Sequence, residues 1–406
     1  MRKVFLLTFP LILVESCSTT DKVKKFKEKP YRTAVDMTRN FNDYGEYDGT
    51  WSVECPNKKV IRILDKRKHE ADLCPPHRTH AEDWCYAREI QAKLTVSWLQ
   101  NLYGIDDCFE MYHHLRKQTS LEIAGEGAEK LTDLEPLFGL SNLEKLTLNG
   151  SSFTRLDVLK TLPNLRVLNI VEGAWIRDTR PLKSLKQLES MHLDSKGNWG
   201  IKLPSLKNHS ELKKVKMDYL SGGLRAFVGS EVESLTVTNI DDLGGLGDLE
   251  AIVHLDVKGC RSAFFPKKFE HLENLKNLKL RWCRLELLPP FEDLSSLEKL
   301  DLSYNKIRRI EFLSHSPVKT LKLHHNQISD LEPLRTLENL RYLNVVDNPE
   351  VRNLEPISNL ESLRKVHLKG TRIYRIWRSQ TARDRYLPLC PAEDHVVEPV
   401  RDFCRS

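Results

Sequence analysis

The sequence predicts an α/β protein built as a right-handed solenoid of about twelve repeats, with a parallel β-sheet on its concave face and a cap at each end. Three observations lead to this prediction. A short apolar–x–apolar segment recurs every 20 to 25 residues between positions 121 and 366. The 406 residues are too many for one small core, and their 40% hydrophobic and 30% charged fractions fit a folded body. Six of the nine cysteines lie outside the periodic region but near its two ends.

The recurring segments are expected to be short strands. Side chains alternate along a strand, so both apolar residues of each segment point into the core and the residue between them points outwards. One repeat cannot bury its apolar side alone, and stacking of neighbours is therefore required. The first apolar residues of the twelve segments are Leu121, Leu146, Leu168, Met191, Val215, Leu235, Leu255, Leu278, Leu300, Leu321, Leu343 and Val366.

A turn position follows five residues after the first apolar residue of each segment. Its side chain points inwards and must bond free backbone groups, which favours asparagine. Asn305, Asn326 and Asn348 occupy it in three late repeats. The earlier repeats lack asparagine there, and the glycine-containing stretch "SGGLRAFVGS" falls among them. We therefore expect poorer turn geometry over residues 195–250.

The phrases "LSNLEKLTL", "LSSLEKLDL" and "LENLRYLNV" resemble leucine-rich repeats, whose pattern is L-x-x-L-x-L-x-x-N/C. The phrases "LTDLEPLFGLSNL" and "ISDLEPLRTLENL" are similar to the 22-residue, internalin-like class of bacterial repeats. The resemblance covers about residues 119–370. It implies a non-enzymatic protein that binds another macromolecule on the concave face of the solenoid.

Two cysteines, Cys260 and Cys283, hold the same turn position in consecutive repeats. Adjacent strands lie roughly 4.8 Å apart, which is within disulfide reach. Two explanations stay open, a disulfide or two buried, reduced thiols that fill the turn. The second is favoured here because cysteine is a common substitute in this repeat pattern.

The N-terminus reads as an export signal. A basic start at Arg2 and Lys3 precedes an apolar run over residues 4–14, which is too short to span a bilayer. The following "VESC" resembles the lipobox of bacterial lipoproteins, although Glu15 departs from the usual spacer. The resemblance implies a signal peptide at 1–16, a lipid on Cys17, a polar tether over 17–45 and an outer-membrane location in the cell envelope, periplasmic or surface-exposed. An ordinary signal peptide is the alternative.

Caps are expected at residues 46–118, as helices, and at residues 371–406. Without Cys17, eight cysteines remain, an even number that suits an oxidising compartment. The disulfide candidates in the caps are Cys55, Cys74, Cys85, Cys108, Cys390 and Cys404. A zinc site at Cys74, His77, His80 and Cys85 is an alternative, but its spacing matches no familiar zinc finger.

No enzyme signature is present: the sequence lacks a G-x-S-x-G elbow, a phosphate-cradling G-x-x-x-x-G-K loop and an H-E-x-x-H motif. No cofactor or metal is therefore expected. The net charge of +6 is too mild to imply a nucleic-acid binder. A protein partner is the main expectation. A glycan binder and a metal-dependent adaptor or metalloenzyme are the alternatives.

The candidate partner-binding residues lie on and just beyond the strands of the later repeats. Trp and Tyr flanked by Arg and His match the composition of binding hot spots. The alternative is structural, since opposite charges alternate on neighbouring strands and would pair laterally. The side chains of the two adjacent histidines are expected to diverge, which disfavours a joint metal site. The candidates are Lys279, Arg281, Trp282, Tyr304, Lys322, His324, His325 and Asp347, and His325–Asp347 is the one pairing to test among them.

Overall fold

The computed structural model describes residues 90–378, with short gaps at 151, 154, 173–175, 177, 195–199, 263–268, 270 and 292, and the backbone of three strands before residue 64. The chain divides into two compact units, residues 1–79 and 80–406. The predicted signal peptide, the lipidation site, the zinc alternative and five of the six cap cysteines lie outside the described residues. Those cysteines are Cys55, Cys74, Cys85, Cys390 and Cys404.

The first unit contains a three-stranded antiparallel sheet of order β1-β2-β3, formed by β1 (Met37–Phe41), β2 (Tyr47–Glu54) and β3 (Val60–Ile63). These strands were not predicted from the sequence. The first lies in the segment interpreted as a tether, and the other two lie in the segment expected to be a helical cap. Their apolar residues follow no repeat, so periodicity gave no signal for them.

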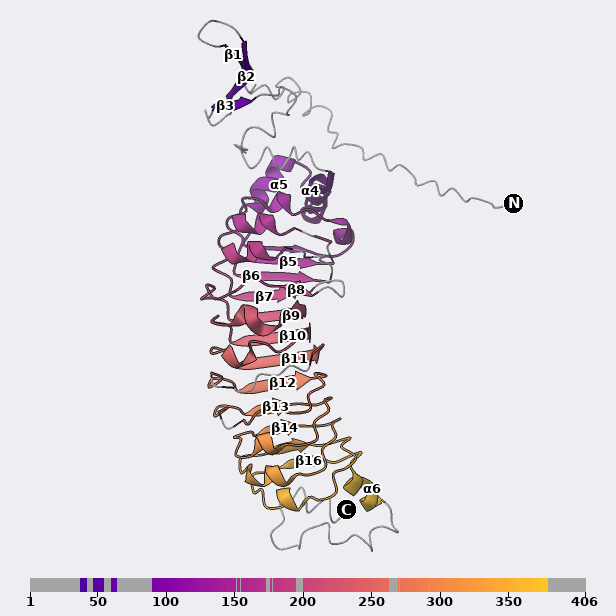
Figure 1. The fold of residues 1–406 in the computed structure, drawn as a ribbon. Helices are drawn as coiled ribbons and strands as arrows, with labels where there is room; N and C mark the ends of the chain where they lie inside the picture. The colour runs from indigo at the N-terminus through magenta and orange to yellow at the C-terminus, as the bar shows by residue number, and fades with distance from the viewer. Residues whose placement is uncertain are drawn as a thin grey trace, which may run out of the picture. The chain divides into compact units, whose positions relative to one another are not determined.

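The second unit is a solenoid whose strands stack in one open parallel sheet (Figure 1). Twelve strands follow each other in chain order, and the short β8 pairs with the C-terminal end of β9. The strands are β4 (Ser120–Ile123), β5 (Lys145–Asn149), β6 (Val167–Val171), β7 (Ser190–Leu193), β8 (Ile201–Lys202), β9 (Lys214–Ser221), β10 (Ser234–Ile240), β11 (His254–Cys260), β12 (Asn277–Arg281), β13 (Lys299–Asp301), β14 (Thr320–Lys322), β15 (Tyr342–Asn344) and β16 (Lys365–His367).

The predicted strand register is confirmed along the whole sheet. Leu121 pairs with Leu146, and the same register continues through each of the twelve predicted positions to Val366. All of the first apolar residues but Val366 are buried, and Val366 packs against the core from a partly buried position. The buried apolar side chains form one continuous core from the α4 end of the solenoid to its α6 end.

Short 3-10 turns form the return leg of most repeats. They are η1 (Ala128–Lys130), η2 (Glu135–Leu137), η3 (Asp157–Thr161), η4 (Arg180–Ser184), η5 (Gly223–Phe227), η6 (Leu246–Asp248), η7 (Glu311–Leu313), η8 (Glu332–Thr336) and η9 (Glu355–Ile357). The recurring "L-E-P-L" and "L-E-P-I" phrases place a proline in the first turn of η2, η8 and η9. Proline fits there because its missing N–H would have no partner within the helix.

Two α-helices cover the N-terminal end of the solenoid, where the sequence predicted helices. They are α4 (Ile90–Tyr103) and α5 (Cys108–Leu115), and Asp107 caps the second by accepting from the Glu110 backbone N–H at 2.9 Å. Thr95 Oγ1 donates to the Asp133 carbonyl at 2.9 Å, which ties α4 to the first repeats. Cys108, one of the predicted cap cysteines, takes part in a disulfide.

At the other end of the solenoid, α6 (Arg372–Arg378) follows the last strand. Ile373 from this helix is buried against the core. Within the described part of the chain, no helix has the length and apolar character needed to cross a membrane.

The poorer turn geometry expected over residues 195–250 stays a prediction, but the described strands in and just after this region differ from the later ones in length. β9, β10 and β11 are the longest strands of the sheet, with 8, 7 and 7 residues. Their turn positions hold Leu220, Ile240 and Cys260, which are buried and keep pairing in register. An apolar side chain at this position packs into the core, so the strand continues where an asparagine would turn it.

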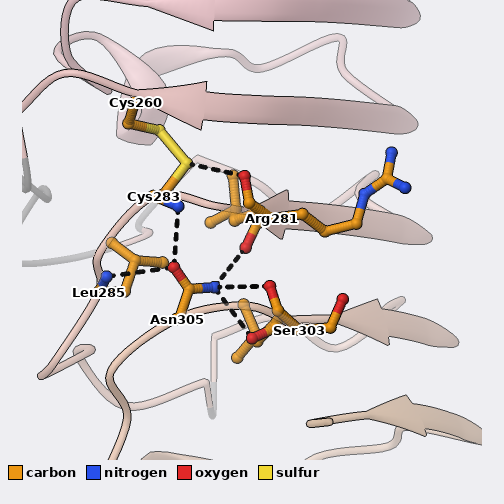
Figure 2. Close-up of a disulfide and its surroundings, with 8 residues drawn as sticks. Cys260, Arg281, Cys283, Leu285, Ser303 and Asn305 are labelled. Atoms are coloured by element: carbon orange, nitrogen blue, oxygen red, sulfur yellow. Dashed lines mark hydrogen bonds between the residues drawn. A yellow bond between two sulfur atoms is a disulfide. The ribbon is translucent and has the colours of Figure 1, made fainter. Parts of the chain in front are cut away.

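The predicted asparagine turn is present in the later repeats. Asn305 Oδ1 accepts from the backbone N–H groups of Cys283 and Leu285 at 2.9 and 3.1 Å, and its Nδ2 donates to the Leu280 and Leu302 carbonyls (Figure 2). Asn326 and Asn348 repeat this arrangement one and two strands further on. Each buried amide therefore ties its own turn to the preceding repeat.

Candidate functional site

The residue four positions after the first apolar residue of each strand segment lies at or near the C-terminal end of its strand. At all eleven such positions that the structure describes, the backbone is left-handed. We call this set the edge column: Gly125, Gly150, Glu172, Tyr219, Asn239, Gly259, Trp282, Tyr304, His325, Asp347 and Gly370. A left-handed conformation costs a non-glycine residue roughly 1–2 kcal/mol. Asn, Asp and His tolerate it best, so bulky aromatic residues there are unusual.

Three consecutive members of the edge column form a stack of rings. The ring centroids of Trp282 and Tyr304 are 4.2 Å apart with an interplanar angle of 9°. Those of Tyr304 and His325 are 4.3 Å apart at 18°. These distances are close to the spacing of adjacent strands, roughly 4.8 Å, so the sheet sets the rings at stacking distance. Each aromatic pair contributes about 0.5–1.5 kcal/mol, which partly offsets the backbone cost.

The stack ends on a carboxylate. His325 Nε2 lies 3.3 Å from Asp347 Oδ2, the pairing singled out from the sequence. At its other end, Trp282 has 52% of its surface exposed. A half-exposed tryptophan fixed in place by a rigid neighbour has the properties of an interface anchor.

Two of the predicted cations are neutralised within the sheet. Asp256 Oδ2 lies 2.9 Å from Lys279 Nζ, and Asp256 Oδ1 lies 2.6 Å from Arg281 Nη2. The register places Asp256 directly opposite Lys279 on the neighbouring strand. The structural explanation for alternating charges therefore holds for this pair, and neither cation is free to dominate a binding surface.

The alternation does not continue to the next strands. Asp301 is buried and accepts from Ser303, at 3.1 Å from the backbone N–H and 2.6 Å from the hydroxyl. Lys322 makes no ion pair among the described residues. Of the predicted cations, only Lys322 therefore remains available on the sheet face.

The other predicted histidine, His324, stands beside the stack. Its ring meets Tyr304 nearly edge-on, with centroids 5.3 Å apart at 80°. Burial is the main reason that the pKa of His324 lies below its usual value, and the neighbouring His325 and Lys322 lower it further. Its neutral form is thus favoured.

The two adjacent histidine rings do not face one another, because their centroids are 5.7 Å apart at 65°. Among the described residues, no group of three or more His, Cys, Asp or Glu side chains is arranged to hold a metal ion. The contacts that the structure shows at this surface are ring stacking and ion pairs.

A cavity of about 400 Å³ opens beside the stack. Trp282 and Tyr304 line it, as do several residues that were not predicted from the sequence: Asn239, Gly259, Arg261, Arg284 and Lys306. One signal could have found the cations. All three lie six residues after the first apolar residue of consecutive segments, so the solenoid must place them in a row.

One residue that lines this cavity, Cys260, belongs to a disulfide (Figure 2). Cys260 and Cys283 are bonded, with Sγ atoms 2.02 Å apart and Cα atoms 4.3 Å apart. The preference for reduced thiols in the sequence analysis is thereby wrong. The register aligns the two turns closely enough for a bridge. The bond joins the residue after Gly259 to the residue after Trp282, which fixes the spacing of these two edge-column positions.

The stacked parallel strands, the apolar register and the asparagine turns together define a leucine-rich-repeat solenoid. Residues 182–305 match the family described as R13L1/DRL21 LRRs, and residues 318–359 match the family described as Leucine Rich repeats (2 copies). The chain therefore contains leucine-rich repeats, as its sequence predicted.

Among solved structures, an internalin of Listeria monocytogenes is similar in fold, with a TM-score of 0.55 and 21% identity over 68% of this chain and 82% of that one. The leucine-rich-repeat protein LIC12759 of Leptospira interrogans aligns with 71% of this chain and 92% of its own, at 18% identity and a TM-score of 0.40. At these identities the likeness concerns the fold alone.

Curated relatives match over shorter shares of their length. Disease resistance protein RRS1 of Arabidopsis thaliana is 26% identical over 266 residues, which are 64% of this chain and 17% of that protein. Acidic leucine-rich nuclear phosphoprotein 32 family member A of Drosophila melanogaster is 36% identical over 98 residues, 24% of this chain and 38% of that protein. The chain thus spans well under half of these relatives.

Proposed function

We propose that this protein is a non-enzymatic recognition module that binds a protein partner through the aromatic run of its edge column. The observation that carries the proposal is the stack of Trp282, Tyr304 and His325, which occupies a backbone conformation unfavourable to bulky residues. Such strain is typical of functional positions. A core-forming role does not explain it, because Trp282 remains half exposed.

The arrangement suits recognition because it is preformed. The buried asparagine ladder and the Cys260–Cys283 bond hold the turns that carry the rings. The rings stack on each other before any partner arrives, so little side-chain entropy is lost on binding. Rigid aromatic anchors of this kind contribute most of the energy in many protein interfaces.

A capture experiment tests this proposal. The double variant Trp282→Asn/Tyr304→Asn removes both rings while keeping a residue that tolerates the left-handed backbone, as Asn239 does in the same column. Photo-crosslinked envelope proteins would be captured with the wild type, the double variant and a control, Tyr219→Asn. Tyr219 has the same column position and a φ of 53°, three strands before Trp282.

We expect the wild type and the Tyr219→Asn control to recover the same partner band, and the double variant to lose at least nine-tenths of it. Equal recovery by the double variant would contradict the proposed function. Circular dichroism and a thermal melt of each variant distinguish lost binding from lost folding.

We also propose that the protein acts in the envelope of a two-membrane bacterium, tethered to the outer membrane by a lipid on Cys17. The basic start, short apolar run and "VESC" motif support this location. Labelling of expressing cells with radioactive palmitate is expected to mark the wild type and to leave Cys17→Ala unmarked. Equal labelling of both proteins, or labelling of neither, would contradict the anchor.

A further inference from the structure

Gly259 interrupts the edge column directly before its aromatic run. Lys258 pairs with Arg281 in the sheet, so Gly259 lies beside Trp282 on the neighbouring strand. The Cys260 backbone N–H donates to the Trp282 carbonyl at 3.3 Å, which fixes the two turns against each other. Because glycine has no side chain, a slot roughly one strand spacing wide, 4.8 Å, opens at this point of the column. The Asn239 side chain borders it closely, since a Cβ on Gly259 would lie 3.0 Å from Asn239 Oδ1.

The slot faces an unused aromatic surface. One face of the Trp282 indole is covered by Tyr304, which comes from the following strand. The opposite face points towards the preceding strand, where Gly259 offers no ring. The cavity of about 400 Å³ lies at this place and is lined by Trp282, Gly259 and, one strand further back, Asn239. Its volume lies within the usual range for ligand sites, about 300–1,000 Å³.

The rim of the slot is basic. Arg261, Arg284 and Lys306 line the cavity, and no carboxylate does. Arg261 Nη1 lies 3.5 Å from Asp241, and Lys306 Nζ lies 4.0 Å from Glu286, so these two cations are partly neutralised. Arg284 makes no ion pair among the described residues and is exposed. The charge of the rim is therefore complementary to an anionic ligand.

The geometry points to a particular occupant, and we infer that the slot binds an aromatic side chain of the partner, tyrosine or phenylalanine, flanked by acidic residues. This inference rests on the proposed function and specifies the chemistry of its partner. The incoming ring becomes the fourth member of the stack, between Trp282 and Asn239. The flanking carboxylates contact the cations of the rim, with Arg284 as the available bidentate group.

A flat ring suits the slot better than a sugar does. The existing rings are nearly parallel, at 9° and 18°, which is the geometry of aromatic stacking. A sugar would also need several free hydrogen-bonding groups around it. The amide of Asn305 is fully used by the backbone, and Asn239 Nδ2 already donates to Asp218 at 3.4 Å.

The test compares two glycines at equivalent positions. Gly259→Asn fills the slot with a residue that suits a left-handed backbone, and its Cβ shifts the Asn239 side chain, whose Oδ1 it would otherwise meet at 3.0 Å. Gly150→Asn makes the same change at the same column position, where a new Cβ meets nothing within 4 Å and no aromatic run follows. Arg284→Gln removes the available cation, and Arg309→Gln is its exposed control.

Binding would be measured by isothermal titration with the full protein at low salt. The probes are the blocked peptide Glu-Glu-Tyr-Glu-Glu, the same peptide with Leu in place of Tyr, and a linear oligoglucuronate. We expect the tyrosine peptide to bind the wild type at least tenfold more tightly than the leucine peptide. Gly259→Asn should weaken it at least tenfold and Arg284→Gln severalfold, while both controls bind as the wild type does.

Three results would overturn the inference: equal binding of the tyrosine and leucine peptides, an unchanged affinity of Gly259→Asn, or tight binding of oligoglucuronate in place of the tyrosine peptide. If Gly259→Asn does not fold, the affinity of Arg284→Gln and the comparison of the two peptides still test the inference. Failure here, with partner capture still lost in Trp282→Asn/Tyr304→Asn, would leave the proposed function intact. Capture of the partner by that double variant would contradict both the proposed function and this inference.

Discussion

His325 lies between an aromatic ring and a carboxylate: its imidazole stacks on Tyr304 at 4.3 Å, and its Nε2 lies 3.3 Å from Asp347 Oδ2. The side chains of His325 and Asp347 are both partly exposed, with 41% and 46% of their surfaces accessible. The contact with Asp347 therefore fixes the orientation of the His325 ring, while its contribution to the free energy of unfolding is small.

Removal of this carboxylate should cost little stability. Asp347→Asn keeps a residue that tolerates the left-handed backbone but removes the charge, and exposed pairs contribute only about 0–1 kcal/mol. We expect the free energy of unfolding, measured with urea, to fall by less than about 1 kcal/mol. A much larger loss would mean that the stack depends on this charge for its folding.

The asparagine ladder should behave in the opposite way. Asn326→Ala removes a buried amide whose Oδ1 accepts from Ile307 N–H at 3.0 Å and whose Nδ2 donates to the Leu302 and Leu323 carbonyls. Each buried backbone group left unpaired costs about 1–3 kcal/mol, so the loss should be at least about 2 kcal/mol by urea unfolding.

An exposed asparagine provides the matched control for the ladder. Asn274 Nδ2 makes a single bond, to the Glu250 carbonyl at 3.0 Å, at the surface. Asn274→Ala is expected to lower the free energy of unfolding by less than about 1 kcal/mol. Similar losses in both variants would show that burial does not decide the strength of these bonds.

The Cys260–Cys283 disulfide closes a segment with a sequence separation of 23 residues. Restriction of the unfolded chain by a loop of this size stabilises the native state by roughly 3 kcal/mol. We expect Cys260→Ala/Cys283→Ala to have a clearly lower melting temperature, and mass spectrometry of the thiol-blocked, non-reduced wild type to find neither cysteine modified. Two blocked thiols at these positions would contradict the bridge.

Acid should weaken the solenoid through its half-buried histidines. Burial is the largest cause of the lowered pKa of His324, and it acts in the same direction on His192 and His367. The unfolded chain then takes up protons first, so stability falls as the pH drops below about 6.5, the usual pKa of an unfolded histidine. Above that pH, both states are neutral and this contribution disappears.

His324→Gln tests the pH effect. Urea unfolding between pH 7.5 and pH 5 should show a shallower loss of stability for His324→Gln than for the wild type. His192 and His367 account for part of the remaining slope. Parallel curves for the two proteins would show that His324 does not contribute to the acid sensitivity.

The sheet could be predicted from sequence because its information is repeated. An apolar residue at the position of Leu300 recurs with nearly constant spacing in twelve segments, and a register error in one strand would expose its apolar side chains. The asparagine turns and the His325–Asp347 pair follow from the same register. Positions that the period fixes were therefore predicted correctly.

The site was harder to predict because the apolar period reports burial and not backbone conformation or empty space. The left-handed backbone at Trp282 recurs at this position in every described repeat, but the spacing of apolar residues does not reveal it. The slot depends on the absence of a side chain at Gly259, which in sequence looks like an ordinary turn glycine. Whether Cys260 is bridged or free depends on the Cα–Cα distance to Cys283, which is 4.3 Å. The sequence places the two residues at equivalent positions of adjacent repeats but does not give that distance.

The left-handed edge column also has an evolutionary consequence. Each described repeat offers one residue whose backbone conformation is already left-handed, a conformation that Gly, Asn, Asp and His adopt most readily. A new Cβ meets nothing within 4 Å at Gly125 or Gly150, whereas at Gly259 and Gly370 the neighbouring Asn239 and Asp347 would have to move. Equivalent positions on adjacent strands are spaced roughly 4.8 Å apart. Selection can therefore alter what the molecule recognises one repeat at a time, while the buried leucines and asparagines continue to stabilise the fold.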